Sequence, residues 1–321
     1  MKLITLFILI FFALGINAQQ VPSKVENIPY LVTFGKQASK SHGDDDFSQV
    51  IFISIPKSYT KPFYIRLYDP ETSGELDENI GDFNTKTSFQ IFGGEGCYSS
   101  KDAKNINPVG NYKSGNLLKS KSFGNTSTYD KKWYSFGPFN PSQGEYAPEF
   151  KSNIFKIVVS GVSGNDGNLY KFFISTSKTQ NQEVEGANFF AYEYTFRLHS
   201  DPNQVAHVYP FVDSTVVSII QQNFDWDNDG YIQLYSSKTY AKNLSASADN
   251  TWAKSKYTIK KGEHNKSIDI RFTKKKGSKE NKNNVVFYIT NQYGEHMPFF
   301  VMPLGGVPKY KAKISVKKST K

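Results

Sequence analysis

Short apolar or alternating runs, separated by turn residues, recur along most of the chain beyond residue 20. Residues 50–55 form a nearly continuous apolar run that ends at Pro56, and Phe63–Tyr68 alternates between apolar and polar positions. Such runs, rich in β-branched and aromatic side chains, predict strands. No apolar spacing of helical period is sustained over about ten residues or more. The sequence therefore predicts an all-β protein.

A turn-rich segment, Gly164-Asn-Asp-Gly-Asn168, separates two apolar runs at 155–159 and 170–175. Because Asn, Asp and Gly adopt the left-handed conformations of tight hairpin turns, this segment predicts a β-hairpin. Further strands are expected at 192–198, 216–220, 231–235, 256–259, 268–272, 285–290 and 299–302.

Two strand motifs occur twice in the same order. Residues 63–68 resemble 230–235, and residues 172–175 resemble 287–290. We interpret the pair as two tandem β-sandwich domains of jelly-roll type, residues 19–185 and 186–321, joined within 178–186. The motifs lie farther apart in the first domain, which therefore carries an insertion, and the second domain ends in a basic tail.

The first eighteen residues have the pattern of a secretory signal peptide. Met1-Lys2 precedes an apolar run at 3–16, and Ala18 is a small residue at the expected cleavage position. The run is too short to span a bilayer. We therefore expect an exported protein, periplasmic or extracellular at the cell surface, with no transmembrane segment in the mature chain and no nucleic-acid partner.

Charge and cysteine content narrow the partners. The formal net charge is +10, and basic residues concentrate at 254–282 and in the tail. Such asymmetry favours association with an envelope protein, an anionic polysaccharide or lipopolysaccharide; alternatively, lysines keep sheet edges from associating.

Cys97 is the single cysteine, which excludes an internal disulfide and predicts a small buried side chain, with an intermolecular disulfide as the alternative. The sequence does not indicate an oligomeric state.

The sharpest short motif is Asp225-Trp-Asp-Asn-Asp-Gly230. Carboxylates at alternate positions before a glycine suit a calcium loop, with Asp225, Asp227, Asp229 and the carbonyl of Tyr231 as ligands. It is not an EF-hand, because the twelfth position is Ser236. The alternative is a plain turn with solvated carboxylates.

A second acidic region begins at Asp44-Asp45-Asp46 and continues through Asp69, Glu71, Glu75, Asp77, Glu78 and Asp82. Its irregular spacing allows calcium binding. It also allows a glycosidase-type carboxylate pair, which requires two carboxyl groups facing each other across a cleft.

Four aromatic residues are candidates for stacking on sugar rings: Trp133, Tyr134, Trp226 and Trp252. Trp226 lies inside the acidic loop, where we expect it to be exposed; the alternative for all four is burial. No catalytic serine, histidine-metal, nucleotide-binding or cysteine-protease motif is found.

Two resemblances to known proteins rest on short segments of the sequence. The strands at 50–56 and 62–68, followed by an acidic loop, resemble the pre-peptidase C-terminal type of β-sandwich module, which implies a non-catalytic role. The segments 32–36, 92–97, 133–139, 224–230 and 303–308 are similar to uncharacterised exported envelope proteins of Gram-negative bacteria, which implies no particular activity.

Together, these observations predict a non-catalytic exported binding or structural protein of the cell envelope, stabilised by calcium. Two alternatives remain open: a carbohydrate-binding protein that uses exposed Trp and Tyr, and a hydrolase with a carboxylate site in the first domain.

Overall fold

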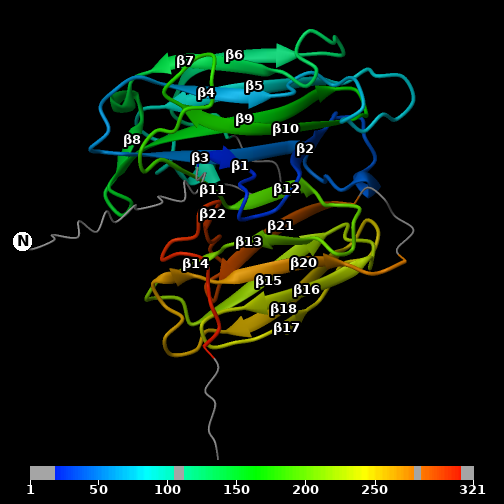
Figure 1. Ribbon diagram of the computed structural model, residues 1–321, viewed down its shortest axis with the longest axis vertical. Helices are drawn as coiled ribbons and strands as arrows, with labels where there is room; N and C mark the ends of the chain where they lie inside the picture. Colours follow the sequence, from blue (N-terminus) through cyan, green and yellow to red (C-terminus); the bar gives the residue numbers. More distant parts are fainter. Residues whose placement is uncertain (1–18, 105–111, 278–282, 312–321) are drawn as a thin grey trace, which may run out of the picture.

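The computed structural model describes residues 19–104, 112–277 and 283–311 (Figure 1). The described chain consists of strands and three short 3-10 helices, Lys40–His42, Lys101–Lys104 and Pro141–Gln143. The all-β prediction is therefore confirmed. In these described ranges no helix is long and apolar enough to cross a membrane. The signal peptide predicted at 1–18 lies outside the described residues.

The strands form two large sheets and two smaller ones. A nine-stranded sheet has the order β18-β15-β21-β12-β2-β10-β4-β7, with β1 beside β10, and a seven-stranded sheet has the order β22-β11-β3-β9-β5-β6, with β8 beside β9. A four-stranded sheet has the order β13-β20-β16-β17, and β14 pairs with β19. The strand bounds are β1 Gln20–Val21, β2 Tyr30–Phe34, β3 Ser48–Pro56, β4 Phe63–Tyr68, β5 Lys86–Gly93, β6 Asn116–Phe123, β7 Trp133–Phe139, β8 Glu145–Ala147, β9 Ser152–Ser163, β10 Gly167–Ser175, β11 Asn188–Ala191, β12 Glu193–Arg197, β13 Val205–Val208, β14 Phe211–Val212, β15 Ser218–Phe224, β16 Gly230–Tyr235, β17 Lys242–Leu244, β18 Trp252–Thr258, β19 Lys266–Ser267, β20 Asp269–Lys274, β21 Asn284–Asn291 and β22 Phe299–Phe300.

We call residues 19–185 the first half and residues 186–311 the second half. In the first half, aromatic side chains join the nine-stranded sheet to the seven-stranded sheet. Phe63 of β4 packs edge-on against Phe155 of β9, with ring centroids 5.2 Å apart. Phe89 of β5 lies 5.3 Å from Tyr170 of β10 in the same arrangement. The alternation of these strands thus places one apolar row from each sheet in a common core.

In the second half, the four-stranded sheet covers the other end of the nine-stranded sheet. Phe272 of β20 has its ring centroid 5.3 Å from Phe196 of β12 and 5.3 Å from Phe287 of β21. These contacts belong to the same buried cluster that fills the first half. One apolar core therefore extends through both halves.

The two halves also share backbone ladders. β12 pairs with β2 through Phe196–Leu31 and Arg197–Tyr30, and β11 pairs with β3 over residues 188–191. In Figure 1, β11, β12 and β22 accordingly lie between the blue-to-green first half and the yellow-to-orange second half. The division into domains 19–185 and 186–321 stays a prediction, but the described strands on its two sides are hydrogen-bonded in both large sheets.

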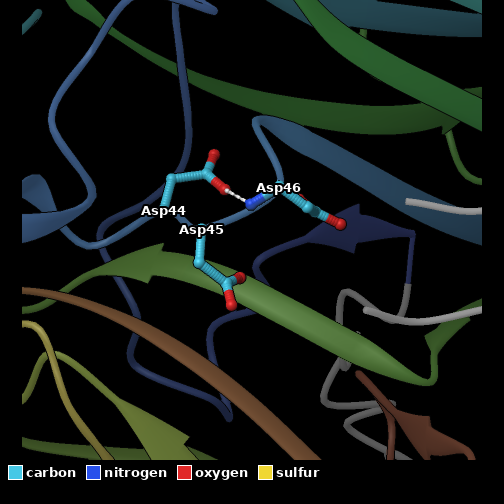
Figure 2. Close-up of side chains that lie close together, drawn as sticks. All are labelled: Asp44, Asp45 and Asp46. Atoms are coloured by element: carbon cyan, nitrogen blue, oxygen red, sulfur yellow. Dashed lines mark hydrogen bonds between the residues drawn. The ribbon is translucent and has the colours of Figure 1, made fainter. Parts of the chain in front are cut away.

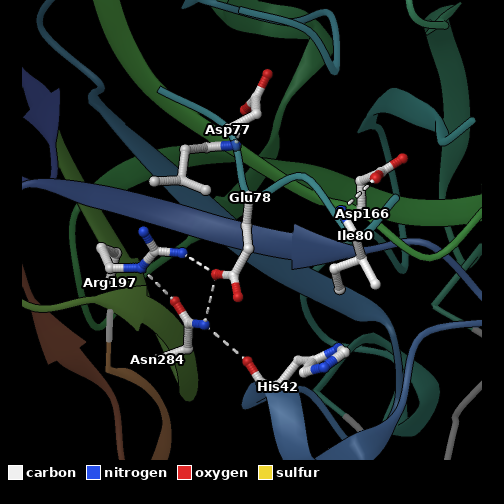
Figure 3. Close-up of polar contacts among 8 residues, drawn as sticks. His42, Asp77, Glu78, Ile80, Asp166, Arg197 and Asn284 are labelled. Atoms are coloured by element: carbon white, nitrogen blue, oxygen red, sulfur yellow. Dashed lines mark hydrogen bonds and ion pairs between the residues drawn. The ribbon is translucent and has the colours of Figure 1, made fainter. Parts of the chain in front are cut away.

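A buried polar network crosses the same junction (Figure 3). Arg197 of β12 forms an ion pair with Glu78, and its Nε donates to Asn284 Oδ1 at 2.6 Å. Asn284 Nδ2 donates to the carbonyl of His42 at 2.7 Å and to Glu78 Oε2 at 3.2 Å. Two loops of the first half are thereby fixed to two strands of the second.

The hairpin predicted around 164–168 is wrong. β9 and β10 flank this turn but belong to different sheets, so the turn carries the chain across the core. The Asp166 carboxylate explains this course, because it accepts the backbone N–H groups of Ile80, Asn84 and Thr85. The turn is thus anchored to a neighbouring loop and does not close a ladder between its own flanks.

The internal repeat is also absent from the topology. β4 and β10, which carry the first copy of the two motifs, are neighbours in one sheet, whereas β16 and β21, which carry the second copy, lie in different sheets. Cys97 agrees with its prediction as a small buried side chain: it is fully buried, its thiol donates to the carbonyl of Ile154 at 3.2 Å, and burial raises its pKa to about 12.

Candidate metal centre

The acidic loop connects β15 of the nine-stranded sheet to β16 of the four-stranded sheet. Asp225, Asp227 and Asn228 have left-handed backbone conformations, with φ of 59°, 58° and 54°, which Asp and Asn tolerate better than most residues. Ser247, in the connection between β17 and β18, fixes the loop. Its hydroxyl accepts the N–H of Trp226 and its carbonyl accepts the N–H of Asn228, both at 2.8 Å.

This fixation brings a third carboxylate to the loop. Carboxylate oxygens of Asp225, Asp227 and Asp249 lie within 4.8 Å of one another. Calcium binds oxygen ligands at roughly 2.3–2.6 Å, so two ligands of one ion lie no more than about 5 Å apart. The three acids are therefore close enough to contact a single ion. Sequence reasoning missed Asp249 because it lies on a separate connection and carries no motif of its own.

Electrostatics at Asp225 also favour a cation. Its side chain is buried and accepts the N–H of Asn250 at 2.6 Å. Burial, followed by the charges of Asp227 and Asp249, raises the pKa of Asp225 to about 7. A cation at this point would lower that pKa and relieve the repulsion among the three carboxylates.

A buried amide adjoins the same group. Asn283 is 1% exposed, and its Nδ2 donates to Asp227 Oδ2 at 3.2 Å. Its Oδ1 is buried and has no hydrogen-bond partner among the described residues. Rotation of this amide by half a turn would present Oδ1 to a cation beside Asp227, and amide oxygens are calcium ligands.

The other two predicted ligands lie outside this group. The Asp229 carboxylate is directed to Lys274, with Oδ2 4.0 Å from Nζ, and the Lys274 side chain is almost completely buried. Tyr231 lies in β16 with its backbone opposite Thr273, and its ring is 53% exposed. Asp229 thus supplies the counter-charge of a buried lysine, and the backbone of Tyr231 belongs to the ladder between β16 and β20. Neither residue joins the group of Asp225, Asp227 and Asp249.

The expectation that Trp226 is exposed is wrong: the side chain is fully buried and lies 6.0 Å from the ring of Phe272. Gly230 makes this burial possible, because a Cβ added there would lie 2.2 Å from Cζ2 of Trp226. The glycine of the motif is therefore required for the close approach of the indole.

The remaining aromatic candidates are half-buried and separate from one another. Trp133 of β7 lies beside Tyr68, at 5.2 Å, and the Arg66 guanidinium is 5.0 Å from its ring centroid. Tyr134, on the opposite face of the same strand, packs against Phe123 and Phe136 at the core. Trp252 of the edge strand β18 contacts Phe224 and Tyr288. Of the four, only Trp226 is fully buried, and the other three keep part of their aromatic surface exposed to solvent.

Acids between β4 and β5 mostly hold loops. Asp77 accepts the N–H groups of Ser73 and Leu169, both at 2.7 Å, and Glu71 accepts the N–H of Tyr129 at 2.5 Å. These bonds assign Asp77 and Glu71 a structural role, in which each carboxylate satisfies backbone donors that the loop would otherwise bury without partners.

Comparison with known proteins identifies no family. No family model matches the chain, and no curated protein matches it. Among solved structures, a protein of Parabacteroides distasonis provisionally described as secreted is 10% identical, with 89% of this chain and 95% of that chain covered and a TM-score of 0.21. Structures of Macrobrachium rosenbergii nodavirus and of Penaeus vannamei nodavirus are 9% and 10% identical to this chain. Each comparison covers 82% of this chain, with 88% and 96% of the nodavirus chains covered, and both give TM-scores of 0.17. Similarity this low carries no argument about function.

Proposed function

We propose that this chain is a non-catalytic, exported binding or structural protein of the cell envelope, built from two β-sandwich domains and stabilised by calcium. The observation that carries the calcium proposal is the convergence of Asp225, Asp227 and Asp249 from two separate connections. Three neighbouring carboxylates, one of them buried, destabilise a fold unless a cation or protons neutralise them.

Export is supported by the pattern of residues 1–18. The envelope partner is proposed from charge: exposed Lys254 and Lys256 lie on the edge strand β18, and Lys260 and Lys261 follow it. Lysines on an edge strand prevent unwanted strand pairing, and a row of them also attracts an anionic polysaccharide, lipopolysaccharide or the acidic face of another envelope protein.

Thermal unfolding of protein lacking residues 1–18, in calcium and in EDTA, tests the calcium proposal. An ion that binds only the folded state at 100 times its dissociation constant stabilises it by about 2.7 kcal/mol. We expect calcium to raise the melting temperature of the parent and Asp227→Asn to lose the part of that rise due to this loop. Asp201→Asn, at an exposed position outside both acidic regions, is the matched control. Equal calcium-dependent rises in Asp227→Asn and the parent would refute a site in this loop.

Carbohydrate binding is a second candidate, favoured by the outer face of the first half. Trp133, Tyr68 and Tyr30 are half-buried there, and Lys171 of β10 lies between Tyr68 and Tyr30, opposite the first and over the ring of the second. Flat rings beside a lysine ammonium suit stacking and hydrogen bonding to a sugar. Affinity electrophoresis through gels containing a neutral or an acidic polysaccharide tests it: Trp133→Ala should abolish retardation, whereas Tyr293→Ala, at a remote exposed ring, should not. The absence of any retardation of the parent would exclude this candidate for the polysaccharides used.

A further inference from the structure

A second group of acids lies at the junction of the two halves, between the first 3-10 helix and β3. Carboxylate oxygens of Asp44, Asp45 and Asp46 lie within 4.8 Å of one another. Figure 2 shows the Asp44 carboxylate directed to the backbone nitrogen of Asp46, while the Asp45 side chain points away from it. Asp44 also accepts the N–H groups of Phe47, at 2.8 Å, and Phe34, at 3.3 Å. Asp44 therefore shapes the loop that presents the other two acids.

A fourth carboxylate faces this loop from the second half. Glu193 begins β12, and burial followed by the charges of Asp46, Asp45 and Asp44 raises its pKa well above the usual range. Its Oε2 is buried and has no hydrogen-bond partner among the described residues. Thr195, 1% exposed and on the same face of β12, likewise has a buried hydroxyl without a partner in that part of the chain. Glu193 thus brings one unsatisfied carboxylate oxygen to the Asp44–Asp46 loop, and Thr195 leaves a second unsatisfied oxygen two residues further along β12.

The space between Asp46 and Glu193 fits one ion. Asp46 and Glu193 line a cavity of about 10 Å³, together with Tyr112, Tyr192 and Lys104. That volume is roughly what a single water molecule or bare cation requires. The Lys104 Nζ lies over the ring of Tyr98, 3.8 Å from its centroid. A second hollow, of about 730 Å³ and lined by Asp45, Asp46 and Lys113 among others, lies beside the same loop.

We propose that Asp45, Asp46 and Glu193 bind a second divalent cation of calcium type, which ties the loop before β3 to β12 and so joins the two halves. Carboxylates from both halves would supply the ligands. Hard oxygen ligands and a flexible geometry favour calcium over transition metals. The site goes beyond the proposed function, because it does not depend on the 225–229 loop.

Equilibrium dialysis against calcium, with protein lacking residues 1–18, separates the two sites by stoichiometry. We expect two ions per chain in the parent, one in Asp227→Asn, one in Glu193→Gln, and none in the double variant. Glu183→Gln, an exposed glutamate between β10 and β11, is the matched control and should retain both ions. A single ion that Asp227→Asn removes would overturn the junction site and leave the loop proposal intact. A single ion that only Glu193→Gln removes would do the reverse.

Because Glu193 is largely buried, a second variant and a second probe guard against misfolding. Asp46→Asn should remove the same ion as Glu193→Gln, with an unchanged far-ultraviolet circular dichroism spectrum. In the Asp227→Asn protein, terbium should show tyrosine-sensitised emission that calcium displaces, since Tyr112 and Tyr192 line the cavity. If that protein folds and gives no sensitised emission, the junction site is falsified.

Discussion

The two acidic sites differ in how the chain assembles them. In the 225–229 loop, Asp225 and Asp227 are close in sequence, and the third acid, Asp249, comes from a connection in the same half. At the junction, three consecutive aspartates lie near Glu193, which follows them by about 150 positions and belongs to the second half. The first arrangement can order one loop. The second can act only when the two halves are already docked.

Because of this difference, a cation at each site would stabilise a different part of the fold. A cation in the 225–229 loop would stabilise a connection between two sheets of one half, whereas a cation at the junction would stabilise the docking of β12 against the segment before β3. The predictions below separate these two contributions, beginning with the largest.

Removal of calcium from the parent should have the largest effect. If each site is filled at 100 times its dissociation constant and the two act independently, EDTA should lower the free energy of unfolding by about 5 kcal/mol. Urea unfolding in calcium and in EDTA measures this difference. About half of it should persist in Asp227→Asn. Equal free energies of unfolding in the two buffers would contradict both sites.

Breaking the junction without touching either acidic site should be nearly as costly. Arg197→Met leaves the Glu78 carboxylate, whose side chain is 16% exposed, without its ion pair. Removing one partner of a buried pair typically costs about 3–5 kcal/mol. Lys131→Met, which breaks the exposed pair with Glu75, should cost less than about 1 kcal/mol. Equal losses in the two variants, measured by urea unfolding, would show that the junction network does not hold the halves.

Separate substitutions of Asp249 and Asp229 by asparagine test which acids of the 225–229 loop and its neighbour bind the ion. Asp249→Asn should remove the calcium-dependent stabilisation of this site, about 2.7 kcal/mol at 100 times the dissociation constant. Asp229→Asn should keep it, because the Asp229 carboxylate faces Lys274. Calorimetric titration with calcium distinguishes the variants. The opposite result would restore the ligand set expected from the spacing of the motif.

Glu26 is a buried acid outside both candidate sites, so its titration can be followed in EDTA separately from theirs. Burial raises its pKa to about 8, and the Ser23 N–H, donated at 2.7 Å, and Tyr194 only partly oppose this shift. Between the unfolded value of 4.5 and about 8 the folded state holds the proton more tightly, so stability should fall as pH rises.

The magnitude of this pH effect is modest over a practical range. Between pH 6 and pH 7.5 the loss should be about 2 kcal/mol, since one proton per unit of pH corresponds to about 1.4 kcal/mol. Glu26→Gln should remove that slope, measured in EDTA so that neither acidic site binds an ion. A slope that persists unchanged in Glu26→Gln would assign it to other groups.

The sequence predicted the strands better than their partners. Alternation located β4 at its observed bounds and β21 within one residue at each end, because side-chain periodicity is a local property. It could not show that β9 and β10 lie in different sheets, since this depends on the bonds from Asp166 to residues 80–85. A turn motif specifies a reversal of the chain and leaves open which sheet receives the returning strand.

The candidate site divides in the same way. Alternate carboxylates identified Asp225 and Asp227, whereas Asp249 and Glu193 are brought in by contacts between distant segments. Trp226 was expected at the surface because its neighbours are charged, yet the missing side chain of Gly230 admits its ring to the core. Polar neighbours in the sequence therefore predict an exposed side chain only where the fold leaves no room for it in the core.

The shared ladders have a consequence for anyone who would dissect the protein. A fragment ending at residue 185 would lack β11 and β12, and so would bare β3 and β2, the strands that these two cover. Both bared strands are predominantly apolar. Two uncovered edges side by side are a template for strand addition between molecules. Such a fragment should therefore assemble into chains of copies, and its failure to stay monomeric would be a property of the cut.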